Sequence, residues 1–152
     1  MDSAQLVVSP EFLPVAIALA ALLGACIGSF ITLVTYRMPR EEKIGATRSQ
    51  CPSCRATLRI PDLIPILSWV KMRGRCRTCR VSISIRYPLT ELACAIGAAL
   101  LVWQGGVSWE TFALCGLWWC IVAIVVTDLE HYIILDEVQV AVGLFGLLYG
   151  WA

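Results

Sequence analysis

Four long apolar runs, separated by polar segments, account for most of this chain. The first extends from Phe12 to Tyr36, and the others cover about residues 89–103, 111–127 and 138–152. A helix needs about 20 apolar residues to cross a bilayer core, and none of the runs shows the alternation typical of a strand. The pattern therefore predicts an all-α membrane protein with about four transmembrane helices, the last one incomplete at 15 residues.

Composition and charge divide the chain into the same parts. Apolar residues make up 59% of the sequence and charged residues 15%, against about 45–50% and 25% in ordinary globular proteins. All twelve lysines and arginines lie between Arg37 and Arg86, together with only three acids. We therefore expect residues 1–36 to form an external N-terminus and first helix, residues 37–88 a basic loop, and residues 89–152 three further helices.

The basic segment also predicts the orientation of the chain. Lysine and arginine are retained on the cytoplasmic side during membrane insertion, so the loop of residues 37–88 should be cytoplasmic. The chain would then be a multi-pass protein of a bacterial inner membrane, with Asp128 at the cytoplasmic end of the third helix. A basic patch can bind nucleic acid, but between two membrane spans it is more simply a topological signal, and we expect no nucleic-acid partner.

Four cysteines of the basic loop form two CxxC pairs, Cys51 with Cys54 and Cys76 with Cys79, separated by 21 residues. Two such turns can supply the closed tetrahedral shell of four thiolates that structural zinc prefers, and neighbouring arginines favour the thiolate form. Disulfides and a dithiol redox site are the alternatives. A cytoplasmic location argues against structural disulfides, and a redox site needs no second pair. The pattern favours structural zinc, against the alternative that these cysteines bind no metal.

Two further features concern the apolar runs. Gly24 and Gly28 form a face of small residues, which allows a neighbouring helix to approach closely and makes a homo-oligomer plausible.

The third run is followed directly by the acidic segment 128–136. A carboxylate at a membrane boundary is costly unless neutralised, paired or hydrated, so Asp128 is a candidate functional group. The simpler interpretation is that Asp128 ends a helix and faces water, and that His131 caps the helix or faces solvent.

Several of these stretches together resemble the prepilin leader peptidases, the membrane aspartic proteases of type IV pilus and type II secretion systems. Gly28 to Pro39 is similar to the exit of that family's first helix, and Asp128 to Asp136 to its segment DxxxxxxPD, with Leu135 in place of proline. The similarity to the family's zinc loop and second-helix entry lies in four stretches: 51–59, 62–69, 73–79 and 83–91.

The resemblance implies an integral membrane aspartic endopeptidase with Asp128 as the first catalytic aspartate. Its substrates would be prepilins or pseudopilins, whose basic leader is cut on the cytoplasmic face. Many family members then methylate the new N-terminus with S-adenosylmethionine, which is implied here by resemblance only. Zinc would be held by the four cysteines of the loop, and the lipid bilayer would surround the helices.

One departure from the family bears on activity. The second catalytic aspartate of the family lies in a GxGD segment, which this sequence does not contain. Asp136 and Glu130 are weak candidates to replace it. We therefore expect a truncated or minimal member unable to cleave alone. The alternative is a non-catalytic membrane scaffold or assembly partner, whose zinc-stapled loop docks proteins or anionic lipid heads.

Overall fold

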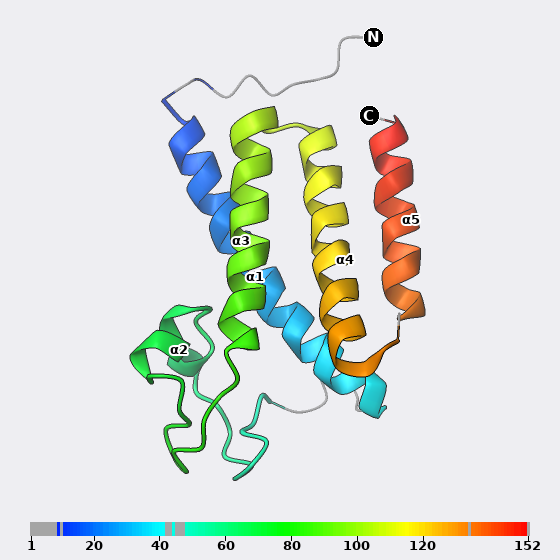
Figure 1. The fold of residues 1–152 in the computed structure, drawn as a ribbon. Coiled ribbons are helices and arrows are strands. Elements are labelled where there is room, and N and C mark those ends of the chain that lie inside the picture. Colours follow the sequence, from blue (N-terminus) through cyan, green and yellow to red (C-terminus); the bar gives the residue numbers. More distant parts are fainter. Residues whose placement is uncertain (1–8, 10, 42–43, 45–47, 134, 152) are drawn as a thin grey trace.

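The computed structural model describes residues 9, 11–41, 44, 48–133 and 135–151. Four helices dominate this part of the chain: α1 (Leu13–Arg37), α3 (Arg86–Gly105), α4 (Trp109–His131) and α5 (Asp136–Trp151). The last three lie side by side, and α1 crosses α3 to reach the end of α4 (Figure 1). No strand is formed by the described residues, so the prediction of an all-α protein is confirmed.

Three helical segments are long and apolar enough to cross a membrane: Leu13–Arg40, Arg86–Gly105 and Trp109–His131. The fourth predicted run does form a helix, but α5 has only 16 described residues, fewer than the roughly 20 that a span requires. The chain is therefore a multi-pass membrane protein with three helices of spanning length among its described residues.

The contact between α1 and α3 depends on glycine. A Cβ atom at Gly24 would lie 2.5 Å from the carbonyl oxygen of Cys94, and one at Gly28 would lie 2.7 Å from the Cα atom of Glu91. The two backbones thus approach within a distance that no side chain permits. This small-residue face is occupied within the chain, so it no longer supports self-association, which stays a prediction.

We expect Gly28→Ala to destabilise the protein by about 1–3 kcal/mol, because the added methyl group must push the backbones of α1 and α3 apart. Thermal unfolding in detergent micelles measures the loss. Gly146→Ala is the matched control, since a Cβ atom at Gly146 meets nothing within 4 Å and alanine favours a helix. Equal midpoints for the two variants would contradict the close approach.

Indole hydrogen bonds join α3 to α4. The Nε1–H group of Trp118 donates to the carbonyl oxygen of Ala93 at 3.1 Å, and that of Trp119 to Cys94 at 3.4 Å. The turn before α4 is closed by Ser108, whose hydroxyl oxygen accepts the backbone N–H of Thr111 at 3.1 Å. This N-cap satisfies a donor that the first turn of a helix leaves unpaired.

The loop between α1 and α3 lies at one end of the helices, beside the end of α1 and the start of α3 (Figure 1). It contains the short helix α2 (Leu67–Lys71) and two 3-10 turns, η1 (Met38–Arg40) and η2 (Ile60–Asp62). Inside it, the indole N–H of Trp69 donates to the carbonyl oxygen of Ile83 at 3.1 Å. With so little apolar core, a loop of this size needs additional cross-links to keep one conformation.

Candidate metal centre and aspartate segment

The two CxxC pairs fold as two copies of one turn. An isolated bridge between Gln50 and Thr57 encloses the first pair, and a bridge between Arg75 and Ser82 encloses the second. In each copy the N–H of the first cysteine donates to the carbonyl five residues later, at 3.0 Å for Cys51 and 2.9 Å for Cys76. The matching hydrogen bonds show that local sequence, repeated 25 positions apart, determines both turns.

An arginine follows each pair in the left-handed region, Arg55 with a φ of 56° and Arg80 with a φ of 61°. The N–H of each arginine donates to the carbonyl of the first cysteine of its pair, at 2.9 Å and 3.0 Å. A side chain in this region is disfavoured by roughly 1 kcal/mol relative to glycine. The turn is thus held against a local backbone preference, as expected where another interaction fixes its geometry.

These turns bring the four cysteine sulfurs within 4.8 Å of one another, with Cys51 and Cys76 buried and Cys54 and Cys79 exposed. The Sγ atoms of Cys51 and Cys79 are 3.8 Å apart. Zinc–sulfur bonds of about 2.3 Å in a tetrahedron place the sulfurs about 3.8 Å apart, whereas a disulfide needs about 2.05 Å. The cysteines are free, and their spacing fits a zinc ion.

Charge at the cluster also favours a cation. The backbone N–H groups of Cys79 and Thr78 lower the pKa of Cys76 to about 6, so that this thiol ionises readily. The N–H of Val81 lowers the pKa of Cys79, but desolvation and the neighbouring sulfurs outweigh it and raise that pKa to about 11. A bound divalent ion would allow all four thiols to ionise, because four converging sulfurs cannot all carry negative charge without a cation between them.

One of the arginines next to the cysteines, Arg77, is engaged by a carboxylate. Arg77 forms an ion pair with Asp62, with its Nη2 atom 2.5 Å from Oδ1. Asp62 is buried, and its other carboxylate oxygen accepts the N–H of Arg59 at 3.1 Å. Arg77 therefore ties the second cysteine turn to η2, and the low pKa of Cys76 comes first from backbone N–H groups.

Glu91 connects the loop to the membrane helices, a role that the sequence alone did not reveal. It is buried in α3, and its Oε2 atom accepts the backbone N–H of Ile66 at 2.6 Å. Ile66 has a φ of 62° in a tight turn closed by a hydrogen bond from Leu67 N–H to Pro65 O. Such a conformation is an outlier for a β-branched residue, so the Glu91 contact holds a strained turn in place.

The aspartate segment begins inside a helix and not in a loop. The polar break was predicted to start at Asp128, but α4 continues to His131, so Asp128 and Glu130 belong to its last turns. Tyr132, in the left-handed region, ends the helix. Asp136 is the first residue of α5, so Glu130 does not share a loop with it. The side chain of Asp128 is exposed and, within the described part of the chain, makes no hydrogen bond or ion pair.

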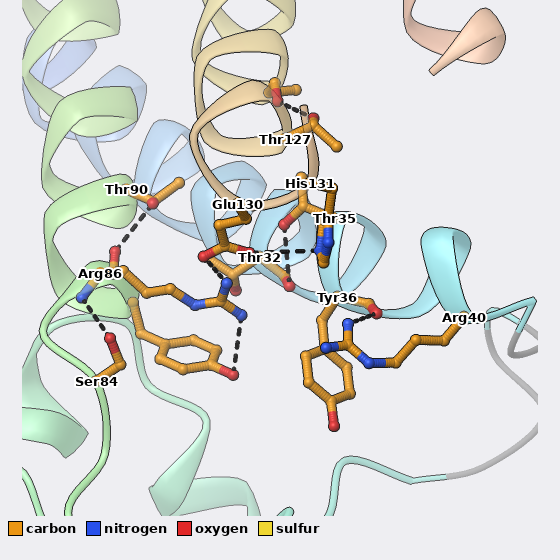
Figure 2. Close-up of polar contacts among 12 residues, drawn as sticks. Thr32, Thr35, Tyr36, Arg40, Ser84, Arg86, Thr90, Thr127, Glu130 and His131 are labelled. Atoms are coloured by element: carbon orange, nitrogen blue, oxygen red, sulfur yellow. Dashed lines mark hydrogen bonds and ion pairs between the residues drawn. The ribbon is translucent and has the colours of Figure 1, made fainter. Parts of the chain in front are cut away.

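Glu130 forms an ion pair with Arg86, the first residue of α3 (Figure 2). The Nη2 atom of Arg86 also donates to the hydroxyl of Tyr87 at 3.3 Å. The Nε2 atom of His131 lies 3.8 Å from the second carboxylate oxygen of Glu130 and is buried without a hydrogen bond. The ion pair joins the end of the cysteine loop to the helical turn that carries Asp128.

Breaking this pair should loosen the contact between α3 and α4. We expect Arg86→Glu or Glu130→Arg alone to lower stability by about 1–3 kcal/mol, since both groups are partly buried. The double exchange should recover at least half of the loss, as measured by thermal unfolding in micelles. Additive losses in the double variant would show that the two charges do not interact.

A known protein family matches the part of the chain that contains the cysteine loop. Residues 22–105, which include most of α1, the cysteine loop and α3, match the family described as the Bacterial Peptidase A24 N-terminal domain. The chain belongs to this family. The match covers more than half of the sequence but ends before α4, so it includes the four cysteines and not Asp128.

Individual relatives extend the similarity along nearly the whole chain. A "Prepilin leader peptidase/N-methyltransferase" of Stutzerimonas stutzeri is 35% identical over 91% of this chain and 57% of its own length. A "Type 4 prepilin-like proteins leader peptide-processing enzyme" of Escherichia coli O78:H11 is 37% identical over 94% of this chain and 59% of its own. The chain thus spans under two thirds of these relatives. No solved structure matches it.

Proposed function

We propose that this chain provides the cysteine loop and the first catalytic aspartate, Asp128, of an aspartic-type prepilin leader peptidase. The names of its relatives support the substrate class, a prepilin or pseudopilin with a short leader. The observation that carries the proposal is the position of Asp128, exposed in α4 at the end of the helices where the cysteine loop lies (Figure 1). Prepilin cleavage by the Asp128→Asn variant tests it.

The chemistry requires a second carboxylate. In an aspartic protease one carboxylate removes a proton from water while a protonated partner donates to the carbonyl oxygen of the scissile peptide. Glu130 is poorly suited as that acid because it already forms an ion pair with Arg86. Asp136 is exposed at the start of α5. It is therefore a better candidate than Glu130 for the second carboxylate.

Zinc has a structural role in this proposal. A shell of four thiolates leaves no open coordination position, so the ion would fix the loop without taking part in hydrolysis. Cys51, Cys54, Cys76 and Cys79 would hold it. The loop would then present a defined surface at the membrane boundary, to which a leader peptide can bind.

We place the loop and Asp128 on the cytoplasmic side of a bacterial inner membrane. The support is charge, since all lysines and arginines lie in one segment. We expect a cysteine introduced at the exposed Val107, in the turn between α3 and α4, to react with an impermeant maleimide in intact cells. A cysteine at Lys71 should react only after lysis. The reverse pattern, each compared with the parent chain, would overturn the orientation.

The second candidate function is a non-catalytic membrane scaffold that docks partner proteins through the zinc-stapled loop. The convergence of four cysteine sulfurs within 4.8 Å of one another, which can hold a structural ion and stiffen the loop, supports it. Under this alternative, Asp128→Asn leaves partner binding and prepilin processing unchanged. The relatives' names also include N-methyltransferase, and methyl transfer from S-adenosylmethionine enters the proposal on that ground alone. We assign no residue of this chain to the methyl donor.

A further inference from the structure

A groove of about 990 Å³ lies between the cysteine loop, the second half of α1 and the adjoining ends of α3 and α4. Its wall on α1 begins with Cys26, Phe30 and Leu33 and ends with Arg37, and Arg40 of η1 continues it. Arg37 lies eleven positions after Cys26 along the helix, so the apolar end is about 16 Å from the basic end. The long axis of the groove therefore follows a helix of membrane-spanning length from its apolar body to its basic end.

The lining of the groove carries an excess of positive charge. Five arginines line the groove, against three carboxylates. Two of these carboxylates are already engaged with positive side chains, Asp62 with Arg77 and Glu130 with Arg86. The third, Glu91, accepts a backbone N–H from Ile66. Of the five arginines, Arg40 and Arg48 are exposed and form no ion pair with these three carboxylates.

Three of the arginines that line the groove are exposed: Arg40, Arg48 and Arg55. Arg40 lies over the ring of Tyr36, 4.1 Å from its centroid, and donates to the carbonyl oxygen of the same residue at 2.6 Å (Figure 2). These contacts fix the direction of its guanidinium group without neutralising it. Arg48, on the loop side, is exposed. A guanidinium held in this way is suited to paired hydrogen bonds with a phosphate.

We propose that this groove binds an anionic phospholipid such as phosphatidylglycerol, with the phosphate at Arg40 and Arg48 and an acyl chain along Phe30 and Leu33. The chemistry has two parts, a fixed positive end and an apolar end aligned with a membrane helix, which together match an amphiphile. Basic pockets between transmembrane helices at the membrane surface bind lipid headgroups in this manner.

Other occupants fit these observations less well. A soluble anion would use the arginines but gains nothing from the apolar wall, of which Phe30 is 53% exposed. A basic leader peptide is repelled by the same arginines. The inference does not depend on the proposed peptidase activity, because lipid binding can be measured on a catalytically silent chain.

The experiment uses the zinc-loaded protein in an uncharged detergent, with native mass spectrometry and thermal unfolding as readouts. Phosphatidylglycerol should bind one to a chain and raise the thermal midpoint, whereas phosphatidylcholine should do neither. One basic side chain contributes about fivefold to the affinity for an anionic lipid. The double variant Arg40→Gln/Arg48→Gln should therefore bind phosphatidylglycerol about 30-fold more weakly, with its zinc content unchanged.

The matched control, Lys71→Gln/Arg73→Gln, removes two exposed charges of the same loop that do not line the groove. It should retain binding within about threefold. An equal loss in both variants would overturn the proposal in favour of general charge attraction. Equal stabilisation by glycerol 3-phosphate, or equal binding of phosphatidylcholine, would also overturn it. Equal stabilisation by glycerol 3-phosphate would mean that the site recognises a soluble phosphate. Equal binding of phosphatidylcholine would mean that the site does not distinguish an anionic headgroup from a zwitterionic one.

Discussion

Loss of zinc should unfold the cysteine loop and leave the membrane helices folded. We expect the purified protein to contain one zinc ion per chain, and Cys51→Ser/Cys76→Ser to contain less than a tenth of that. These are the two buried cysteines of the cluster, one from each turn, so the variant removes half of the ligand set and the enclosed part of the site. Structural zinc sites contribute about 10–16 kcal/mol of apparent binding free energy, more than a small loop can replace.

The measurements are elemental analysis for zinc and amide hydrogen exchange for the loop. Exchange should increase across residues 48–84 in the variant and in protein treated with a strong chelator, while α3 and α4 stay protected. Cys26→Ser is the matched control, because Cys26 is an exposed cysteine of α1 outside the cluster. A metal-free protein with a fully protected loop would refute the zinc assignment.

The cysteine cluster and the helices could be predicted from sequence because both depend on local patterns. Apolar runs of membrane length determine α1, α3 and α4, and the CxxC spacing determines each cysteine turn. Their assembly could also be anticipated in part, because Gly24 and Gly28 predicted a close helix contact that proved to be with α3. The sequence pattern did not predict which helix would pack against that face.

Contacts between distant polar residues could not be read from the sequence in the same way. Glu91 was visible only as a charge near the start of an apolar run, and its partner is the backbone N–H of Ile66 in an irregular turn. The signal that could have identified it is a carboxylate one turn inside a membrane helix, which needs a partner. The role of Glu130 likewise depends on a distant residue, because its ion-pair partner Arg86 lies on another helix.

The end of α4 was misplaced for a related reason. Asp128 and Glu130 are charged, and a change from apolar to charged residues predicts the end of a membrane helix. A helix continues beyond the membrane boundary when its charged residues find partners or water, and here Glu130 is paired and Asp128 is exposed. The hydrogen-bonded end is instead at Tyr132, whose N–H donates to the carbonyl oxygen of Asp128 at 3.0 Å.

Where the parent chain processes a prepilin, replacement of Asp128 by asparagine should abolish that processing without altering the fold. Asparagine has the same shape but cannot accept the proton of the attacking water, so we expect cleavage to fall by at least about 10³-fold. Because the Asp128 side chain is exposed and unpaired within the described residues, zinc content and thermal midpoint should remain those of the parent chain. The assay is mass spectrometry of a prepilin co-expressed in cells that lack their own leader peptidase.

Two parallel variants locate the second carboxylate. If Asp136 provides it, Asp136→Asn should lose cleavage as completely as Asp128→Asn, while Glu130→Gln should retain most of it because Glu130 serves the ion pair with Arg86. Cleavage that survives Asp128→Asn would exclude the aspartic mechanism at this residue. Absence of cleavage by the parent chain, with its loop folded and zinc bound, would instead favour the scaffold. Since the zinc and lipid measurements do not use activity, they would distinguish a silent chain from a misfolded one.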